Sequence, residues 1–487
     1  MNLHLIALQL MAAQGCLGAF DTLYHHELTE ALPGRATARR ELTIHAARAL
    51  MYAALFIGLS SWEFHGAWAL VLLALFGVEI VLTLWDFVVE DRTRLLPATE
   101  RVTHTVLAMN GGAFIALLAL VAMGSSDWLA QPTALVWHPQ GALGVFLALC
   151  GVGVGLSGVR DAFAARTLGR QSGAITPPVH FAAAEAAVLV TGATGFIGQK
   201  LVRALLADGH RVTVLSRQPR AAAWLFDGRV ECIAGFGELG VQRRFDTVIN
   251  LAGARILGWR WSAARRQALR RSRVGLTEQL VAWIAMAQHK PALLLSASAI
   301  GYYGIQASGD ERVLTEQDGP QPMFMSDLCR EWEQAAGAAT AYGVRVACLR
   351  FGLVLGTQGA LPMMLLPVKL GLGGPLGRGT QWLSWIHVDD LIAALAHVWQ
   401  NNGNDSAGGA YNFTAPEVVT QAQFSRVAAS VWRRPYGLPT PGLPMRLALG
   451  EQADLLLEGQ RVQPARLLAN GFNFRYPALH AALASLR

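Results

Sequence analysis

The sequence predicts two architectures in one chain: an all-α bundle of about five transmembrane helices, followed by an α/β domain with a doubly wound parallel sheet. Three observations support this fold class. Long apolar segments fill the region before residue 170. A glycine-rich turn begins at Gly192, between an apolar strand pattern and a helical pattern. Short apolar strands then alternate with helical patterns as far as residue 350.

The N-terminal third is too apolar for an ordinary soluble domain. Hydrophobic residues make up 53% of the 487-residue chain and charged residues only 15%, and the apolar excess lies in this third. Each apolar segment approaches the roughly 20 residues that a membrane-spanning helix needs. We therefore predict a transmembrane domain over 1–166 and a linker over 167–186. The predicted segments are 4–20, 45–62, 67–89, 104–123 and 140–160.

Arginines follow alternate segments. The loops around 61–66 and 124–139 contain no Lys or Arg. The positive-inside rule then predicts five spans with residue 161 onward in the cytoplasm. We therefore expect the protein to be embedded in the lipid bilayer of a bacterial-type inner membrane. The net charge of +7 needs no nucleic-acid partner, because no basic tail or RNA-binding signature accompanies it. The arginines are Arg35, Arg39 and Arg40 after the first segment, Arg92, Arg94 and Arg101 after the third, and Arg160, Arg166 and Arg170 after the fifth.

Carboxylates and histidines recur four residues apart near the predicted cytoplasmic ends of these segments. Glu41 precedes His45 by four residues, and Glu100 precedes His104 in the same way. Residues at i and i+4 share a helix face, so several helices would point ligands toward one place. A metal or redox site, a network of salt bridges with the nearby arginines, and proton or quinone handling are all open interpretations. The candidate ligands are His25, Glu41, His45, Asp86, Glu90, Glu100 and His104.

The glycine turn is typical of dinucleotide-binding Rossmann folds. Gly192, Gly195 and Gly198 stand in the G-x-x-G-x-x-G pattern between a strand at 187–191 and a helix. We expect the first glycine to allow the tight turn, the second to admit a pyrophosphate, and the third to let helix and strand approach. Further strands are predicted at 211–216, 229–234, 246–251, 292–298 and 344–350.

The end of the second strand favours NADP(H) over NAD(H). An acidic residue at this point would accept hydrogen bonds from a ribose 2′-hydroxyl, whereas the sequence has Ser216 and Arg217. A guanidinium beside a hydroxyl suits a 2′-phosphate. The sequence therefore predicts NADP(H) as the cofactor.

Five motifs then stand in order at plausible spacing. They resemble the extended short-chain dehydrogenase/reductase superfamily, and within it the atypical, epimerase-named NAD(P)-binding branch with a small C-terminal domain of unknown function. The resemblance covers about 187–487 and leaves the N-terminal third unassigned. We accordingly predict an NADP(H)-binding Rossmann domain over 187–432 and a small C-terminal domain over 433–487. The motifs are Thr191–Gly198, Asn250–Ala254, Ser296–Gly304, Leu349–Gly356 and Trp385–Asp390.

The resemblance implies roles for individual residues. The glycine turn and Arg217 would hold the adenosine half of the cofactor, and the stretch from Phe351 to Val354 would approach the nicotinamide. Ser298 falls where the superfamily keeps its catalytic Ser or Thr. The predicted cofactor-binding residues are Gly192, Thr194, Gly195, Phe196, Ile197, Gly198, Ser216, Arg217, Ala252, Gly253, Phe351 and Val354.

The chain departs from the superfamily at its acid/base pair. That pair is a Tyr four residues before a Lys, which lowers the phenol pKa for proton exchange. Phe324 and Leu328 occupy the matching positions. This loss puts both dehydrogenase and epimerase chemistry in doubt. The predicted catalytic residues are Ser298, Tyr302 and Tyr303; Asp327 and His387 are further substitutes, each with an ordinary alternative in a helix start or cap.

Two functions remain open. The first is a membrane-anchored oxidoreductase or epimerase-like enzyme that acts on a small-molecule or lipid-linked substrate at the cytoplasmic face, coupled in one interpretation to a metal or redox site in the helices. The second is a non-catalytic NADP(H)-binding sensor or scaffold. A basic helix with Arg266, Arg270 and Arg273 on one face would bind a substrate phosphate or lipid headgroups, or else be a solvated surface.

Overall fold

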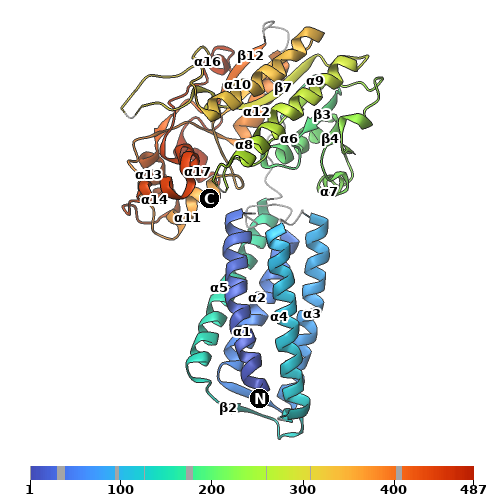
Figure 1. Cartoon of the computed structure of the whole chain (residues 1–487), viewed down its shortest axis with the longest axis vertical. Coiled ribbons are helices and arrows are strands. Elements are labelled where there is room, and N and C mark those ends of the chain that lie inside the picture. The colour runs from blue at the N-terminus through green and yellow to red at the C-terminus, as the bar shows by residue number, and fades with distance from the viewer. Residues whose placement is uncertain are drawn as a thin grey trace. The chain divides into compact units, whose positions relative to one another are not determined.

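The computed structural model describes residues 2–29, 39–93, 98–125, 127–171, 179–258, 260–307, 309–401 and 408–487. It divides into two compact units, Met1–Ile175 and Thr176–Arg487. Figure 1 shows a bundle of long helices in the first unit and a sheet covered by helices in the second. The side chains of Arg35, Arg92, Arg94 and Arg170, which contribute to the alternation of charge along the sequence, lie outside the described residues.

The first unit is a bundle of long helices. Among the described residues, five helices are long and apolar enough to cross a membrane by length and composition. They coincide with the five predicted segments. These helices are α1 (Leu3–Phe20), α2 (Arg39–Leu59), α3 (Ala67–Thr93), α4 (Ala98–Leu120) and α5 (Gly141–Gln171), with π-helical extensions η1 (Asp21–Thr29) after α1 and η4 (Val121–Ser125) after α4.

The two loops that lack Lys and Arg meet at one end of the bundle. β1 (Trp62–His65) pairs antiparallel with β2 (Ala134–Trp137), just after the short helix η5 (Trp128–Ala130). The rings of Trp62 and Trp137 meet edge to face with centroids 4.9 Å apart. Burial alone would raise the pKa of Glu63, but hydrogen bonds with His138 and His65 hold it below its usual value. The alternation of charge along the sequence is thus a difference between the two ends of the bundle.

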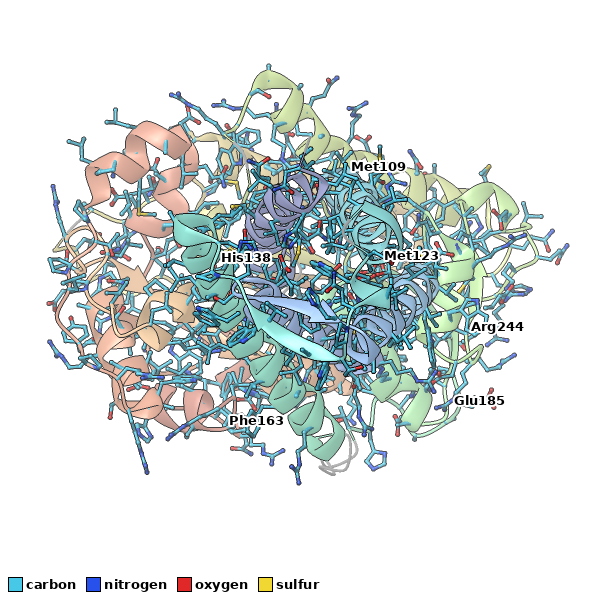
Figure 2. All side chains as sticks on the ribbon, turned by 90° about the horizontal axis from the view of Figure 1, so that it is seen from below. Met109, Met123, His138, Phe163, Glu185 and Arg244 are labelled. Atoms are coloured by element: carbon cyan, nitrogen blue, oxygen red, sulfur yellow. The ribbon has the colours of Figure 1, made fainter. Side chains whose placement is uncertain are left out.

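The outer surface of the bundle is apolar. Met109, Met123 and Phe163 are 72%, 58% and 65% exposed, and Figure 2 shows where they lie on the helices. An exposed apolar surface of this extent on a soluble protein would mark a contact with a membrane or a partner. Other large exposed apolar side chains of the bundle are Leu70, Val81, Leu84, Trp85, Leu149 and Leu156.

Helix α2 packs closely against α5 through small residues. A Cβ atom on Gly151 of α5 would lie 3.1 Å from the carbonyl oxygen of Ala53, and one on Gly158 would lie 3.2 Å from that of Ala46. Glycine on α5 therefore lets the two backbones approach as helices do in membranes.

The second unit contains a seven-stranded parallel sheet in the order β12–β8–β7–β6–β3–β4–β5. The order reverses between β3 and β6, which makes this point the topological switch of a doubly wound fold. The predicted fold class is confirmed for this unit, and six of the strands were predicted; β12 was not. The strands are β3 (Ala187–Thr191), β4 (Arg211–Leu215), β5 (Glu231–Ile233), β6 (Thr247–Asn250), β7 (Leu293–Ala299), β8 (Arg345–Phe351) and β12 (Gly409–Phe413).

Helices cover both faces of this sheet. Alternate residues of a strand point to opposite faces, so Val188 and Val190 enter one core and Leu189 enters the other. The first core is closed by α6 (Phe196–Ala207) and α12 (Val388–Gln400). The second is closed by α9 (Leu276–Met286) and α10 (Phe324–Gly337). The shorter elements between the strands are α7 (Pro219–Leu225), η6 (Phe236–Glu238), α8 (Ala263–Arg270), η7 (Arg271–Gly275), η8 (Ile300–Tyr303) and η9 (Ala338–Tyr342).

The C-terminal segment contributes to the first of these cores and to a further one. Leu467 and Phe472 belong to the core under α12, and Leu479 and Leu483 pack with Phe424 of α13. The predicted small domain at 433–487 thus shares its apolar contacts with the Rossmann domain. Its neighbourhood contains β9 (Leu353–Leu355), α11 (Leu361–Lys369), β10 (Trp382–Leu383), β11 (Trp385–His387), β13 (Val419–Thr420), α13 (Gln421–Trp432), α14 (Gly442–Leu449), η11 (Gly450–Ala453), α15 (Asp454–Leu457), α16 (Ala465–Ala469) and α17 (Leu479–Ala484).

The region predicted as a linker is structured at both described ends. Helix α5 continues to Gln171, past the predicted boundary at 166. Phe181 is fully buried in the second unit, where its ring packs against Trp399. The described residues between 179 and 186 therefore belong to the second unit and form no tether there.

Candidate functional site

The glycine turn has the geometry that a dinucleotide needs. Gly192 has a φ of +69°, and a Cβ there would lie 2.6 Å from the carbonyl carbon of Leu251. A Cβ on Gly198 would lie 2.3 Å from the carbonyl oxygen of Gly192. At Gly195 the nearest atom to a Cβ would be 3.3 Å away, and the residue is exposed. Packing thus demands the outer two glycines, whereas the middle one leaves open backbone at the start of α6.

The first turn of α6 is available to an anion. Gly195 is its N-cap residue and provides no side-chain cap, so no side chain satisfies the first N–H groups of this 12-residue helix. These groups and the helix dipole favour a phosphate. Thr194 is exposed beside the turn. Ile197 and Phe196 are half-buried. The Phe196 ring lies close to Gly356, where an added Cβ would be 2.3 Å from Cζ of Phe196.

A cation lies at the end of β4. Ser216 Oγ accepts a hydrogen bond from the backbone N–H of Gln218 at 3.2 Å, which fixes the turn. Arg217 is exposed and makes no hydrogen bond or ion pair with any part of the chain that the structure describes. The guanidinium is therefore available to a ligand phosphate beside the carboxyl end of the strand.

The loop after β6 is held by buried hydrogen bonds. Thr191 Oγ1 donates to Asn250 Oδ1 at 2.7 Å and accepts from the N–H of Ala252 at 3.2 Å. A Cβ on Gly253 would lie 3.0 Å from Cζ of Arg273, so the loop is pressed against that side chain. These contacts place Ala252 and Gly253 beside the glycine turn, at the switch point where ligands of such sheets bind.

The last two predicted cofactor residues follow β8. Phe351 ends this strand, and its ring meets that of Phe413 with centroids 5.5 Å apart. Val354 lies on β9 and pairs with Ile386 of β11. Both side chains are half-buried against the core under α6 and α12. The residues present therefore fit a dinucleotide across the carboxyl ends of β3, β4, β6 and β8.

Ser298 is part of a buried polar network. Its Oγ donates to Glu333 Oε1 of α10 at 2.7 Å, and the residue is 2% exposed. Arg350, its neighbour across β7 and β8, donates from Nε and Nη2 to the two oxygens of Glu333, each at 2.8 Å. Burial alone would lower the pKa of Arg350, but the hydrogen bonds and charge of Glu333 raise it above its usual value. The Ser298 hydroxyl is thus held by a charged pair.

The two predicted catalytic tyrosines surround Arg350. The Arg350 guanidinium carbon lies 3.5 Å from the ring centroid of Tyr302. The Tyr303 hydroxyl accepts from Arg350 Nη1 at 2.9 Å and donates to Asn412 Oδ1 at 2.7 Å. Burial raises the pKa of Tyr303 to about 12 despite the nearby Arg350. The raised pKa makes this phenol a weaker proton donor, and its two hydrogen bonds are those of a structural hydroxyl.

The other substitutes for the missing acid/base pair have structural partners. Asp327, in the first turn of α10, pairs with Arg330 at 2.8 Å. His387 caps α12, where its Nδ1 accepts from the N–H of Asp389 at 3.2 Å. Phe324, at the start of α10, meets Trp261 with ring centroids 5.3 Å apart, and Leu328 is 1% exposed.

The basic face beside α10 is largely satisfied within the chain. Arg266 pairs with Glu451 at 2.6 Å, and Arg270 makes two hydrogen bonds to Glu331, at 2.9 and 3.0 Å. Arg273 is 7% exposed, and burial lowers its pKa to about 10. The three arginines that the sequence predicted to bind a phosphate or headgroup are therefore paired with carboxylates of the chain or buried.

The sequence did not identify Glu333, Arg350 and Asn412 as part of the site. Arg350 interrupts an apolar strand, and a charge in such a position signals a buried partner. Nothing in the spacing names Glu333, 17 residues away, as that partner. Asn412 lies on the strand β12 that was not predicted.

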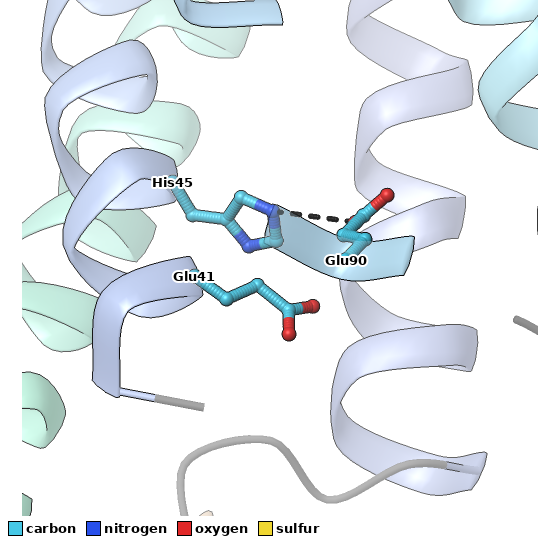
Figure 3. Close-up of side chains that lie close together, drawn as sticks. All are labelled: Glu41, His45 and Glu90. Atoms are coloured by element: carbon cyan, nitrogen blue, oxygen red, sulfur yellow. Dashed lines mark ion pairs between the residues drawn. The ribbon is translucent and has the colours of Figure 1, made fainter. Parts of the chain in front are cut away.

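In the first unit, the histidine–carboxylate pairs converge. Among Glu41, His45 and Glu90, one ligand atom from each lies within 4.8 Å of the other two (Figure 3). Asp86 Oδ2 lies 3.0 Å from His45 Nε2, and Glu90 Oε2 lies 3.3 Å from His104 Nδ1.

The other candidate ligands lie on η1 and α4. His25 Nε2 is 3.4 Å from Thr103 Oγ1, and Glu100 is fully buried on α4. The interpretation as a salt-bridge network assigned these carboxylates to nearby arginines. Three of those arginines are exposed and form no ion pair with described residues: Arg39, Arg40 and Arg101.

Comparison with known proteins identifies the second unit. Residues 188–413 match the NAD dependent epimerase/dehydratase family, and residues 440–486 match a domain of unknown function, DUF1731. Epimerase family protein SSP1921 of Staphylococcus saprophyticus is 40% identical over 300 residues, which cover 98% of that protein and 61% of this chain. The chain belongs to this epimerase family. Epimerase family protein YfhF of Bacillus subtilis is a further relative, 38% identical over 308 residues, or 97% of its length and 61% of this chain.

Similar solved structures agree with an assignment of this chain to the atypical short-chain dehydrogenases/reductases. The human epimerase family protein SDR39U1 (isoform 2), solved with NADPH, is 34% identical with a TM-score of 0.55 and covers 62% of this chain and 98% of its own. A nucleoside-diphosphate sugar epimerase from Corynebacterium glutamicum is 27% identical with a TM-score of 0.50, over 68% of this chain and 62% of its own. The predicted family resemblance is confirmed, and both family matches lie outside the helical bundle.

Proposed function

We propose that this protein is a membrane-anchored, NADP(H)-dependent oxidoreductase of the epimerase family. The observation that carries the proposal is the open glycine turn at the switch point with Arg217 at the end of the neighbouring strand. A 2′-phosphate there would meet a guanidinium, whereas a ribose 2′-hydroxyl would find no carboxylate. The human relative was solved with NADPH, which supports the same cofactor.

The residues of the chain divide the work of binding. The N–H groups at the start of α6 hold the pyrophosphate, Arg217 holds the 2′-phosphate, and Ala252 and Gly253 line the floor. The bound nicotinamide supplies the hydride that an oxidoreductase transfers. The Glu333–Arg350 pair holds Ser298, near the carboxyl end of β7, and Tyr303, which follows it, so these residues would position this strand end beside the cofactor.

The membrane assignment rests on the first unit. Its five apolar helices, its apolar outer surface and the arginine-free β1–β2 end support a multi-pass protein of a bacterial-type inner membrane. The arginines at the other end favour a cytoplasmic second unit. The substrate is then a small or lipid-linked molecule that reaches the enzyme at the cytoplasmic face. Coupling to a redox metal in the helices would make NADPH oxidation depend on metal loading.

A non-catalytic NADP(H) sensor is the second candidate. Phe324 and Leu328 replace the usual acid and its partner, and the hydroxyl groups of Ser298 and Tyr303 are already bonded within the chain. In that case NADPH binding would change the stability or partners of the protein without being followed by turnover.

Isotope transfer separates the two candidates. Full-length protein in mild detergent is incubated with NADPH deuterated at the reactive carbon and a panel of ketones, aldehydes and quinones, and the products are analysed by mass spectrometry. The proposal predicts deuterium in a reduced acceptor, with transfer abolished in Gly192→Ala, which cannot form the turn. Tight NADPH binding without transfer to any acceptor of the panel would favour the sensor.

A further inference from the structure

A cluster of histidines and carboxylates fills one end of the helical bundle, in the unit that neither family match covers. Its members come from η1, α2, α3 and α4, which are distant in sequence but converge here. Glu41 and Glu90 are 0% exposed and His45 is 9% exposed. Ionisable side chains are costly in such surroundings and are retained mainly where they bind, react or pair.

Three of these side chains have the geometry of one metal site. One ligand atom each from Glu41, His45 and Glu90 lies within 4.8 Å of the others. Bonds of about 2.0–2.2 Å to nitrogen or oxygen place two ligands of one ion at most about 4.4 Å apart. Small side-chain rotations therefore suffice to bring all three onto an ion. Figure 3 shows His45 and Glu41 on one helix facing Glu90.

Glu90 also faces a second position. Its Oε1 is 3.8 Å from His45 Nε2, and its Oε2 is 3.3 Å from His104 Nδ1. The other nitrogen of His104, Nε2, is 3.2 Å from Asp21 Oδ2. Each oxygen of one carboxylate thus points to a different imidazole, as in helical bundles where a carboxylate and histidines from facing helices hold two metals.

A layer of hydrogen bonds supports these groups from within the bundle. Arg48 donates to Asp86 Oδ2 at 2.7 Å and to Glu79 Oε1 at 3.1 Å. Tyr52 and Thr83 also donate to Glu79, at 2.9 and 2.8 Å. Asp86 Oδ2 in turn lies 3.0 Å from His45 Nε2, so this layer extends to the imidazole of the cluster. Such supporting bonds are characteristic of metal sites, and here the guanidinium neutralises the supporting carboxylates.

We propose that this cluster binds divalent transition-metal ions: one through Glu41, His45 and Glu90, and a second between Glu90 and Nδ1 of His104, with Asp21 as the supporting carboxylate at the opposite nitrogen of His104. Imidazole and carboxylate ligands together suit iron, manganese or zinc, whereas magnesium and calcium prefer oxygen alone. The ligands all belong to the first unit, so metal binding can be measured without NADP(H).

Metal content tests the proposal directly. Full-length protein in mild detergent is stripped with a chelator, incubated with Mn²⁺ or with Fe²⁺ under anaerobic conditions, desalted and analysed for metal. We expect about one to two ions per chain, and a loss of more than about tenfold in bound metal in Glu90→Gln and in His45→Gln. The low-temperature electron paramagnetic resonance spectrum of bound Mn²⁺ should show coupling between two ions if both positions fill.

Two matched variants control for loss of a buried charge and of a histidine. Asp161→Asn removes a buried carboxylate from α5, which supplies no member of the cluster, and His138→Ala removes an imidazole from the opposite end of the bundle; both should keep the metal. Equal metal in wild type and in Glu90→Gln would overturn the proposal, since the ions would then bind elsewhere. If the ligand variants fail to fold, the wild type still decides. Absence of both retained metal and a Mn²⁺-dependent rise in Tm of the stripped protein would also overturn it.

Discussion

The Glu333→Gln substitution should destabilise the second unit severely. Glu333 accepts two hydrogen bonds from Arg350 and one from Ser298, and the side chains of Arg350 and Glu333 are only 5% and 14% exposed. The amide keeps one acceptor oxygen but removes the charge, so Arg350 is left as an uncompensated buried cation. Breaking such a pair costs about 3–5 kcal/mol in the free energy of unfolding. We take about 3 kcal/mol because the amide retains an acceptor.

The measurement is thermal unfolding of full-length protein in detergent, followed by the ellipticity of the sheet. A loss of about 3 kcal/mol lowers Tm by about 6–12 °C in a unit of this size. The matched control is Glu331→Gln, two residues along the same helix, whose partner Arg270 is 45% exposed. An exposed pair contributes about 0–1 kcal/mol, so this control should lose less than about 4 °C.

A double variant completes the test. Removing Arg350 as well, in Glu333→Gln/Arg350→Gln, eliminates the uncompensated charge, so the combined loss should be smaller than the sum of the two single losses. The reasoning is refuted if Glu333→Gln costs no more than Glu331→Gln, or if the single losses simply add.

Two further predictions concern the glycine turn and the cap of α12. Gly192→Ala should lower the free energy of unfolding by more than about 3 kcal/mol and abolish NADPH binding, because the residue has a φ of +69° and its Cβ would clash with the backbone of Leu251. The control Gly209→Ala has a φ of +85° but no atom within 4 Å of its Cβ, so it should cost only about 1 kcal/mol in urea unfolding and bind NADPH normally. Burial lowers the pKa of His387 to about 4, below the value near 6.5 of an unfolded chain, so the unfolded state binds the proton first. Stability should therefore fall by about 3 kcal/mol as pH falls from about 6.5 to 4 and stay constant above that window, and His387→Asn, which keeps a capping side chain, should lose this dependence; an unchanged pH profile in the variant would contradict the assignment.

The predictable part of the fold came from local pattern. Strands such as β3 are buried on both faces and read as continuous apolar runs, so the parallel sheet and its order of appearance follow from the sequence. Gly192 and Gly198 were predicted because a tight strand–turn–helix junction leaves no room for a side chain. Strand β12 was missed because Asn412 and flanking glycines interrupt its apolar pattern.

The partnerships across elements were not predictable in the same way. Arg350 indicates a buried partner, but only the packing of α10 on β7 and β8 brings Glu333 to it. In the bundle, the i and i+4 spacing of Glu41 and His45 defines a helix face. Because the helices are apolar on nearly every side, the sequence does not say which neighbour that face meets. The structure shows that it meets Glu90.

The central claim, that the second unit binds NADP(H) through Arg217, is tested most directly by calorimetric titration of full-length protein with NADPH and NADH. The claim predicts tighter binding of NADPH, and a loss of about tenfold to a hundredfold in NADPH affinity in Arg217→Ala, with NADH affinity unchanged, because a charge-assisted bond to the 2′-phosphate contributes about 1.5–3 kcal/mol. Arg220→Ala, which removes another exposed arginine on the following helix, should change neither affinity. Equal affinity for the two nucleotides, or an Arg217→Ala protein that binds NADPH as wild type does, would contradict it.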